Sequence, residues 1–148
     1  MPSERVKQFY DSESFAIVGM SGSKRNFAWS IFDQLVGLGK RVYAINPNFD
    51  YYEGVHFYDS LESLPETPEA VVISLDMSKV SGLLESVKNS GVKYVWFQQG
   101  SYDDDVLDEC GRLGLDPIKG CALMHAPGAG FPHNIHRWVN ELFTKGYR

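Results

Sequence analysis

The segment 15–26 constrains the fold of this chain most, because an apolar run passes directly into a turn of small residues and then into a helical pattern. Four apolar residues precede Gly19, and Met20–Ser23 separate this glycine from Lys24 and Arg25. A buried strand that ends at such a turn delivers the backbone to the carboxyl edge of a sheet, where the first N–H groups of the next helix attract anions. The segment therefore predicts a phosphate-binding turn between a strand and a helix.

Two common phosphate-binding motifs do not fit this turn. Ser21 stands in place of the second glycine of the dinucleotide pattern G-x-G-x-x-G, and Lys24 stands in place of the third. The Walker pattern G-x-x-x-x-G-K-[ST] also requires glycine at position 24. A tight connection that needs Gly and Ser for geometry alone is the alternative interpretation. The two adjacent cations favour ligand binding over that alternative.

Composition limits the class of protein. With 148 residues and 43% hydrophobic content, we expect one domain over residues 1–148, with its core at 13–124 and an extension at 125–148. The net charge of −5 opposes binding to nucleic acid. Cys110 and Cys121 are too few for a disulfide framework and are expected to be buried free thiols. No apolar run has the length of a signal peptide or a membrane span, so a soluble cytoplasmic protein is expected.

Strand-like and helix-like stretches alternate along the chain, which predicts an α/β fold with a doubly wound parallel sheet. The simplest arrangement has five strands in the order 3-2-1-4-5, with helices on both faces and a further helix at the C-terminus. The expected strands are 15–19, 41–46, 70–75, 93–97 and 115–118, and the expected helices are 3–10, 26–39, 78–89, 103–113 and 133–145. Asn26 and Ser78 are expected to cap their helices. The aromatic-rich segment 49–58 is expected to form a loop.

Three aspartates, Asp103–Asp105, begin the expected helix at 103–113. Acidic residues in a first turn cap the helix and match its dipole, and this is the preferred interpretation. A metal site built from the three carboxylates is the less favoured alternative.

In a sheet of this order, a ligand lies at the carboxyl edge of the strands, beside the switch point between the first and fourth strands. Four segments that are distant in sequence meet at this edge, each directly after an apolar run. They are 19–26, 46–48, 74–77 and 98–101.

Four short motifs in this order resemble the CoA-binding domain family, in particular small stand-alone bacterial and archaeal proteins of Rossmann-like fold. The motifs are V-G-M-S at 18–21, Y-A-I-N-P at 43–47, Gly54 with the serine- and leucine-containing piece at 58–64, and V-W-F-Q at 95–98. The resemblance covers about residues 15 to 124. The same domain is similar to the nucleotide-binding part of the succinyl-CoA synthetase alpha subunit, and its relatives include NAD-binding redox sensors.

The resemblance implies that CoA lies over the carboxyl edge. Ser21 and Ser23 would hold the pyrophosphate, while Lys24 or Arg25 would neutralise phosphate charge. Residues 46–48 would line the ribose, 74 and 75 the adenine, and 98–100 the pantetheine path. The full set of implied contacts is Gly19, Met20, Ser21, Gly22, Ser23, Lys24, Arg25, Asn26, Asn46, Pro47, Asn48, Ser74, Leu75, Gln98 and Gly100.

Asn46 bears on the choice between CoA and NAD(P). NAD is usually held by an acidic residue about 20 positions beyond the phosphate turn, whereas here the second strand ends in Asn46 and Pro47. CoA carries a 3′-phosphate on the ribose whose hydroxyls such an acid would bind. CoA is therefore the expected ligand, and NAD(P) is the alternative.

The end of the chain departs from the family pattern. Small CoA-binding proteins often close with a cysteine followed by Glu-His, whereas here Cys121 is followed by Ala-Leu-Met and then His125. Cys121 and His125 are weak candidates for catalysis, and His133 and His136 lack the spacing of a standard metal motif. No metal is expected.

Two classes of function remain open at this stage. The preferred class is a module that binds CoA or acyl-CoA without chemistry of its own. The alternative is an acyl-CoA-handling or NAD(P)-dependent enzyme that uses Cys121 and His125. The segment 127–132 is a candidate flap over a ligand. Aromatic residues at 49–58 and 131–143 leave a homodimer open.

Overall fold

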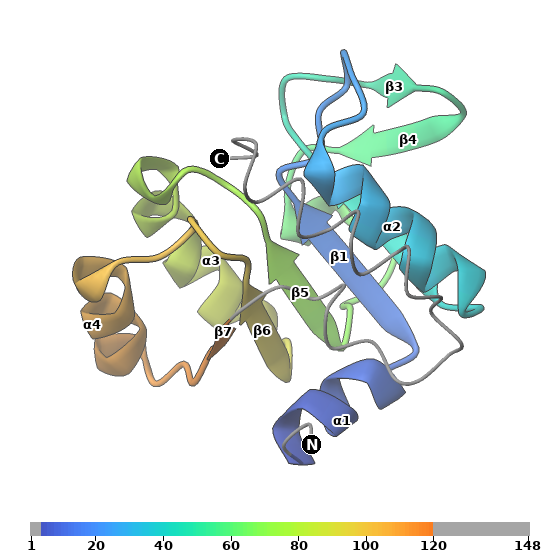
Figure 1. Cartoon of the computed structure of the whole chain (residues 1–148). Coiled ribbons are helices and arrows are strands. Elements are labelled where there is room, and N and C mark those ends of the chain that lie inside the picture. Colours follow the sequence, from blue (N-terminus) through green and yellow to red (C-terminus); the bar gives the residue numbers. More distant parts are fainter. Residues whose placement is uncertain (1–3, 120–148) are drawn as a thin grey trace.

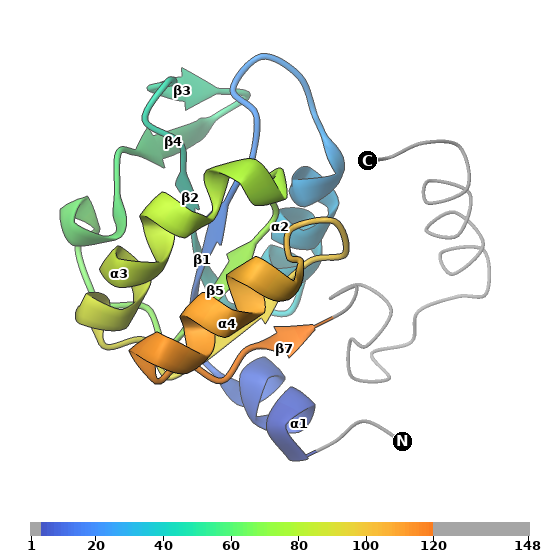
Figure 2. The ribbon, with the colours of Figure 1, turned by 90° about the vertical axis from the view of Figure 1, so that its left-hand side faces the viewer.

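The computed structural model describes residues 4–119 as an α/β sheet with helices on both faces (Figure 1, Figure 2). The strands are β1 (Ser14–Val18), β2 (Arg41–Ile45), β3 (Tyr51–Tyr52), β4 (Val55–Tyr58), β5 (Ala70–Ile73), β6 (Tyr94–Phe97) and β7 (Ile118–Lys119). The α-helices are α1 (Glu4–Asp11), α2 (Phe27–Gly37), α3 (Ser81–Ser90) and α4 (Asp104–Leu113). Two 3₁₀ turns, η1 (Leu61–Ser63) and η2 (Met77–Lys79), precede β5 and α3. The predicted fold class is confirmed.

The predicted number and order of strands are wrong. The described part of the sheet has seven strands in the order β3-β4-β2-β1-β5-β6-β7, and all neighbours except β3 and β4 are parallel. β5 was expected beside β2, but it pairs with β1 through residues 70–73. The position beside β2 that was predicted for β5 is occupied by β4. β4 lies in the segment 49–58, which was expected to be a loop. Counted with β4, the parallel strands follow the Rossmann order 3-2-1-4-5-6.

β4 escaped prediction because its parallel pairing is short. It meets β2 only through Phe57 opposite Ala44 and Tyr58 opposite Ile45. A turn at Glu53 and Gly54, with φ of 49° and 83°, folds β3 back onto β4 as a hairpin. The carboxyl end of β4 therefore lies beside that of β2.

Two hydrophobic cores lie on opposite faces of the sheet. α1 and α2 cover one face, and α3 and α4 cover the other (Figure 1, Figure 2). Within β1, Phe15 and Ile17 belong to the first core, while Ala16 and Val18 belong to the second. The centre of the first core is aromatic, because the ring of Phe9 in α1 lies 5.2 Å from that of Phe15 and 4.8 Å from that of Trp96.

The helix ends follow the expectations in part. Asp103 accepts a hydrogen bond from the N–H of Val106 at 2.9 Å, which confirms its capping role on α4. Gly91 ends α3 in the left-handed conformation, with φ of 84°. The helix expected from Ser78 begins later, because 77–79 form the turn η2, whose cap is Asp76.

The expected C-terminal helix at 133–145, the flap at 127–132, and Cys121 and His125 lie outside the described residues. None of the helices within 4–119 combines the length and the apolar character that a bilayer crossing requires.

Candidate functional site

The turn between β1 and α2 is fixed by side chains that bind its carbonyl groups. Nδ2 of Asn26 donates to the carbonyl of Gly19 at 2.9 Å, and Nδ2 of Asn46 donates to that of Met20 at 2.9 Å. Nε1 of Trp29 donates to the carbonyl of Ser21 at 2.8 Å. Three successive carbonyls are thus held by side-chain donors, so the conformation of the turn depends on residues from β2 and α2.

Asn26 occupies the cap position of α2 without capping it through its side chain, contrary to expectation. Its Oδ1 instead accepts from the N–H of Ser21 at 3.3 Å, so the amide closes the turn onto itself. Ser23 donates its N–H to the hydroxyl of Ser21 at 3.1 Å. The N–H groups of Gly22 and Lys24 bind no acceptor within 4–119 and are available to an anion.

Gly22 has a packing reason as well as a proposed ligand role. A β-carbon on Gly22 would stand 2.2 Å from Cγ of Phe49, in the segment that leads to the β3–β4 hairpin. The glycine lets this segment pack directly on the turn.

The two predicted cations differ in their surroundings. Arg25 forms ion pairs with Glu53 of the hairpin, at 3.1 Å, and with Asp33 of α2, and its guanidinium lies 4.5 Å from the ring centre of Trp29. Lys24 is exposed and has no ion pair within the described chain. The charge of Arg25 is therefore shared by two carboxylates, whereas that of Lys24 is not.

A groove of about 350 Å³ opens beside this turn, at the carboxyl ends of β1, β2 and β5. Of the predicted positions, it is lined by Gly19, Leu75 and the three residues 46–48. Its volume lies at the lower end of the roughly 300–1,000 Å³ found for ligand pockets. The groove is large enough for part of a nucleotide-sized molecule.

Other residues that line the groove were not predicted from the sequence. Asp59 and Ser60 follow β4, and Lys79, Gly82 and Ser86 come from η2 and α3. Asp59 and Ser60 would have been expected at the carboxyl edge of the sheet if β4 had been predicted as a parallel strand. The other three share a helical spacing of three and four residues, a signal of one common face.

Asn46 joins the groove to the turn. Besides its bond to Met20, its Oδ1 accepts the N–H of Asn48 at 3.0 Å. Both the nitrogen and the oxygen of the Asn46 amide are therefore hydrogen-bonded. The residue thereby positions the backbone of 46–48 along the groove.

Ten of the fifteen predicted contacts do not line the groove: the seven residues 20–26 belong to the turn, and Ser74, Gln98 and Gly100 follow β5 and β6. Ser74 directly follows β5, and its N–H bonds to the carbonyl of Val18 at 2.8 Å. Gln98 is fully buried, and Gly100 is exposed with φ of 92°. Ser101, also buried, ties the loop after β6 to β5, because its hydroxyl accepts the N–H of Leu75 at 2.9 Å.

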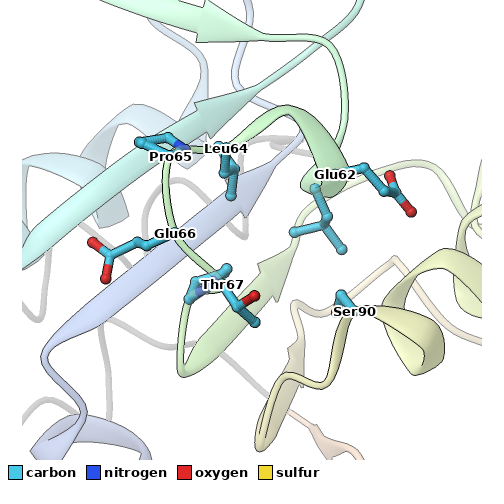
Figure 3. A pocket seen from close by; sticks show the side chains of 8 residues that line it. Glu62, Leu64, Pro65, Glu66, Thr67 and Ser90 are labelled. Carbon is cyan, nitrogen blue, oxygen red and sulfur yellow. The ribbon is translucent and has the colours of Figure 1, made fainter.

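A second cavity, of about 380 Å³, lies where the segment 64–68 enters β5 and where α3 ends at Ser90 (Figure 3). The carboxylates of Glu62 and Glu66 point to opposite sides there and do not face each other (Figure 3). Glu62 accepts from the hydroxyl of Ser86 at 2.8 Å. This cavity contains none of the predicted contacts and no pair of facing acids.

Glu66 belongs to a structural cluster. Nε of Arg41 donates to its carboxylate at 2.7 Å, and the hydroxyl of Tyr43 donates at 2.5 Å. The hydrogen bonds from Arg41, followed by that from Tyr43, lower the pKa of Glu66 to about 2. The cluster fastens β2 to the segment that leads into β5.

Cys110 is a free thiol, as expected, and is buried in the core between α4 and the sheet, where burial raises its pKa. No group of three metal-binding side chains comes together within 4–119. The role expected of Cys121 and His125 stays a prediction.

A comparison with protein families identifies the family of this chain. The family described as CoA binding domain matches residues 13–127. The chain belongs to the CoA-binding domain family. The match spans β1 to β7 and so includes both the turn and the groove.

Several solved structures are similar to this chain in fold. A hypothetical protein from Pyrococcus horikoshii OT3 is 23% identical with a TM-score of 0.75, over 84% of this chain and 89% of that one. A conserved hypothetical protein from Pyrococcus furiosus is 24% identical with a TM-score of 0.65, over 72% and 92%. A protein from Thermus thermophilus is 21% identical with a TM-score of 0.73, over 84% and 95%. These likenesses show the fold of this chain.

Proposed function

We propose that this protein binds CoA or acyl-CoA at the carboxyl edge of its sheet, as a binding module without chemistry of its own. The observation that carries the proposal is the groove beside the turn after β1, within a chain that belongs to the CoA-binding domain family. Gly19 lines the groove and begins the turn. A nucleotide whose pyrophosphate meets the turn would therefore extend its nucleoside into the groove.

The donor set fits such a ligand. Unbonded N–H groups and Lys24 in the turn suit phosphate oxygens. In the groove, amide and hydroxyl side chains at Asn48, Ser60 and Ser86 suit the polar edge of a base or a ribose. Apolar side chains of the groove, such as Leu75, suit the face of a base. The residues present thus match a nucleotide with a phosphate chain.

NAD(H) is a second candidate because of Asp59. No carboxylate directly follows β2, where NAD-binding proteins usually carry one, yet Asp59 lines the same groove from the end of β4. A carboxylate at this place is the kind of group that accepts hydrogen bonds from a ribose diol. The choice between the two ligands is therefore an experimental one.

Calorimetric titration of the full chain with CoA, acetyl-CoA, dephospho-CoA and NAD⁺ tests the proposal. Binding of CoA or acetyl-CoA with a dissociation constant below about 100 μM, a free energy of about −5.5 kcal/mol, supports it. Binding of NAD⁺ alone would establish the second candidate. Absence of binding by all four would refute both.

Catalysis is tested separately from binding. Cys121→Ala and His125→Ala should leave CoA affinity unchanged, and incubation of the protein with acetyl-CoA should release no free thiol. Thiol release that depends on either residue would instead establish an acyl-CoA-handling enzyme. The expected cytoplasmic location belongs to the same proposal, and light scattering of the purified chain distinguishes a monomer from a homodimer.

A further inference from the structure

Lys79 lies in the groove, where the proposed function puts the nucleoside of CoA and with it the 3′-phosphate. It is the last residue of η2, two positions before α3 begins, and it lines the groove together with residues 46–48. Its side chain is exposed and forms no ion pair with any residue from 4 to 119. Hydrogen bonds from Ser78 and, more weakly, the charge of Lys79 lower the pKa of Asp76. No salt bridge to the described residues holds the lysine, so it is available to an anionic ligand.

The other cations near the site are placed differently. Neither Lys24 nor Arg25 lines the groove, and Arg25 already pairs with Glu53 and Asp33. Lys79 is thus the one cation among the described residues that line the groove. The resemblance to the family assigns phosphate charge to Lys24 or Arg25, whereas Lys79 is the cation that lines the groove. Pyrophosphate belongs at the turn, and a phosphate on the ribose belongs in the groove.

We infer that Lys79 is the residue that distinguishes CoA from nucleotides without a 3′-phosphate. The inference rests on the proposed function and adds the source of its specificity. The ammonium group would pair with the 3′-phosphate while the pyrophosphate stays on the turn after β1. A charged contact of this kind favours the phosphorylated ribose and leaves the rest of the ligand unaffected.

Asp59 limits how the phosphate lies. It is the other charged residue among the described lining of the groove, and it forms no ion pair with Lys79. A phosphate in the groove gains from the lysine and is repelled by the carboxylate. The 3′-phosphate therefore lies toward η2, and the base and ribose lie nearer to the end of β4.

The experiment compares CoA with dephospho-CoA, which lacks the 3′-phosphate, by calorimetric titration of the full chain. The wild-type protein should bind CoA at least about tenfold more tightly, the size expected of one charge-assisted contact. Lys79→Met should remove most of this preference by weakening CoA about tenfold and dephospho-CoA less than about twofold. Asp59→Asn should increase the preference.

Lys24→Met is the matched control, because this lysine is also exposed but lies on the turn. It should weaken both ligands by the same factor and keep the preference. Circular dichroism and melting temperature establish that each variant is folded. Equal binding of the two ligands by the wild-type protein, or an unchanged preference in Lys79→Met, would overturn the inference while CoA binding itself stands. Failure of the wild-type protein to bind either ligand would refute the proposed function instead.

Discussion

Gly19 and Ser74 meet backbone to backbone where β1 and β5 end, so that a β-carbon on Gly19 would stand 2.0 Å from the carbonyl oxygen of Ser74. Gly19 also has φ of 115°, a conformation that side chains rarely permit. The glycine that made the sequence look like a nucleotide site is thus required first by the switch point of the sheet. Its presence alone does not indicate a ligand.

Gly19→Ala should therefore lower the free energy of unfolding by about 3 kcal/mol or more, because a backbone oxygen cannot move aside as a flexible side chain would. Urea denaturation measures the change. Gly54→Ala is the control, since Gly54 has φ of 83° but no described atom within 4 Å of an added β-carbon. It should cost only about 1 kcal/mol. Equal losses in the two variants would contradict the close contact.

Gly82 should be a position where a larger side chain blocks the ligand without harming the fold. It lines the groove from the first turn of α3, and a β-carbon there meets no described atom within 4 Å. Gly82→Leu should raise helix stability by up to about 1 kcal/mol and weaken CoA binding by about tenfold or more, the loss of roughly 1.4 kcal/mol of contact. Thermal melting and calorimetric titration measure the two effects.

Gly111→Leu is the matched control for this prediction. Gly111 lies within α4, has the same open space around it and is not part of the groove. Its replacement should raise stability in the same way and leave CoA affinity unchanged. A loss of affinity in both variants, or in neither, would show that the groove does not receive the ligand.

Glu66 should make stability depend on pH in the acidic range. Its pKa is about 2 in the folded chain against an ordinary value near 4.5, so its contribution is complete above about pH 5 and is lost as the pH falls toward 2. Glu66→Gln should cost about 1 kcal/mol at pH 7 and much less near pH 2. Urea denaturation at several pH values checks this. Glu85→Gln, an exposed site without a described ion pair, should show no such trend.

Arg25 should act first on the stability of the turn. A double-mutant cycle of Arg25→Met and Glu53→Gln should give a coupling energy of about 0.5 kcal/mol, as for other exposed ion pairs, which shrinks in 1 M salt. Lys24→Met with Glu53→Gln should give no coupling. A salt-independent coupling, or none for Arg25, would mean that the ion pair to the hairpin does not hold the turn in solution.

The sequence correctly predicted those strands whose own residues form a recognisable pattern. β1 and β5 are continuous apolar runs, so their burial and the turn after Gly19 followed from local pattern. β4 pairs through two residues with a partner more than ten positions away, and nothing local marks such a pairing. Because β4 was not predicted, the predicted strand order was wrong and Asp59 was not expected in the lining of the groove.

The same difference between local patterns and contacts of distant residues applies to the candidate site. Asn46 and Asn48 were expected because they directly follow a strand, and both line the groove. Lys79 was missed because its place depends on η2, a 3₁₀ turn that delays the start of α3. The pairing of Arg25 with Glu53 spans 28 residues and exists only because a hairpin brings the carboxylate back, so no local pattern could predict it.

Because β1 sends alternate side chains into the cores on both faces of the sheet, neither face can be exposed without breaking the other. The two helical layers are therefore expected to unfold as one cooperative unit. Free energy gained from a ligand that touches α3 is then shared by the whole domain. A probe of α1, which lies on the opposite face, would report that binding event as faithfully as a probe in the groove itself.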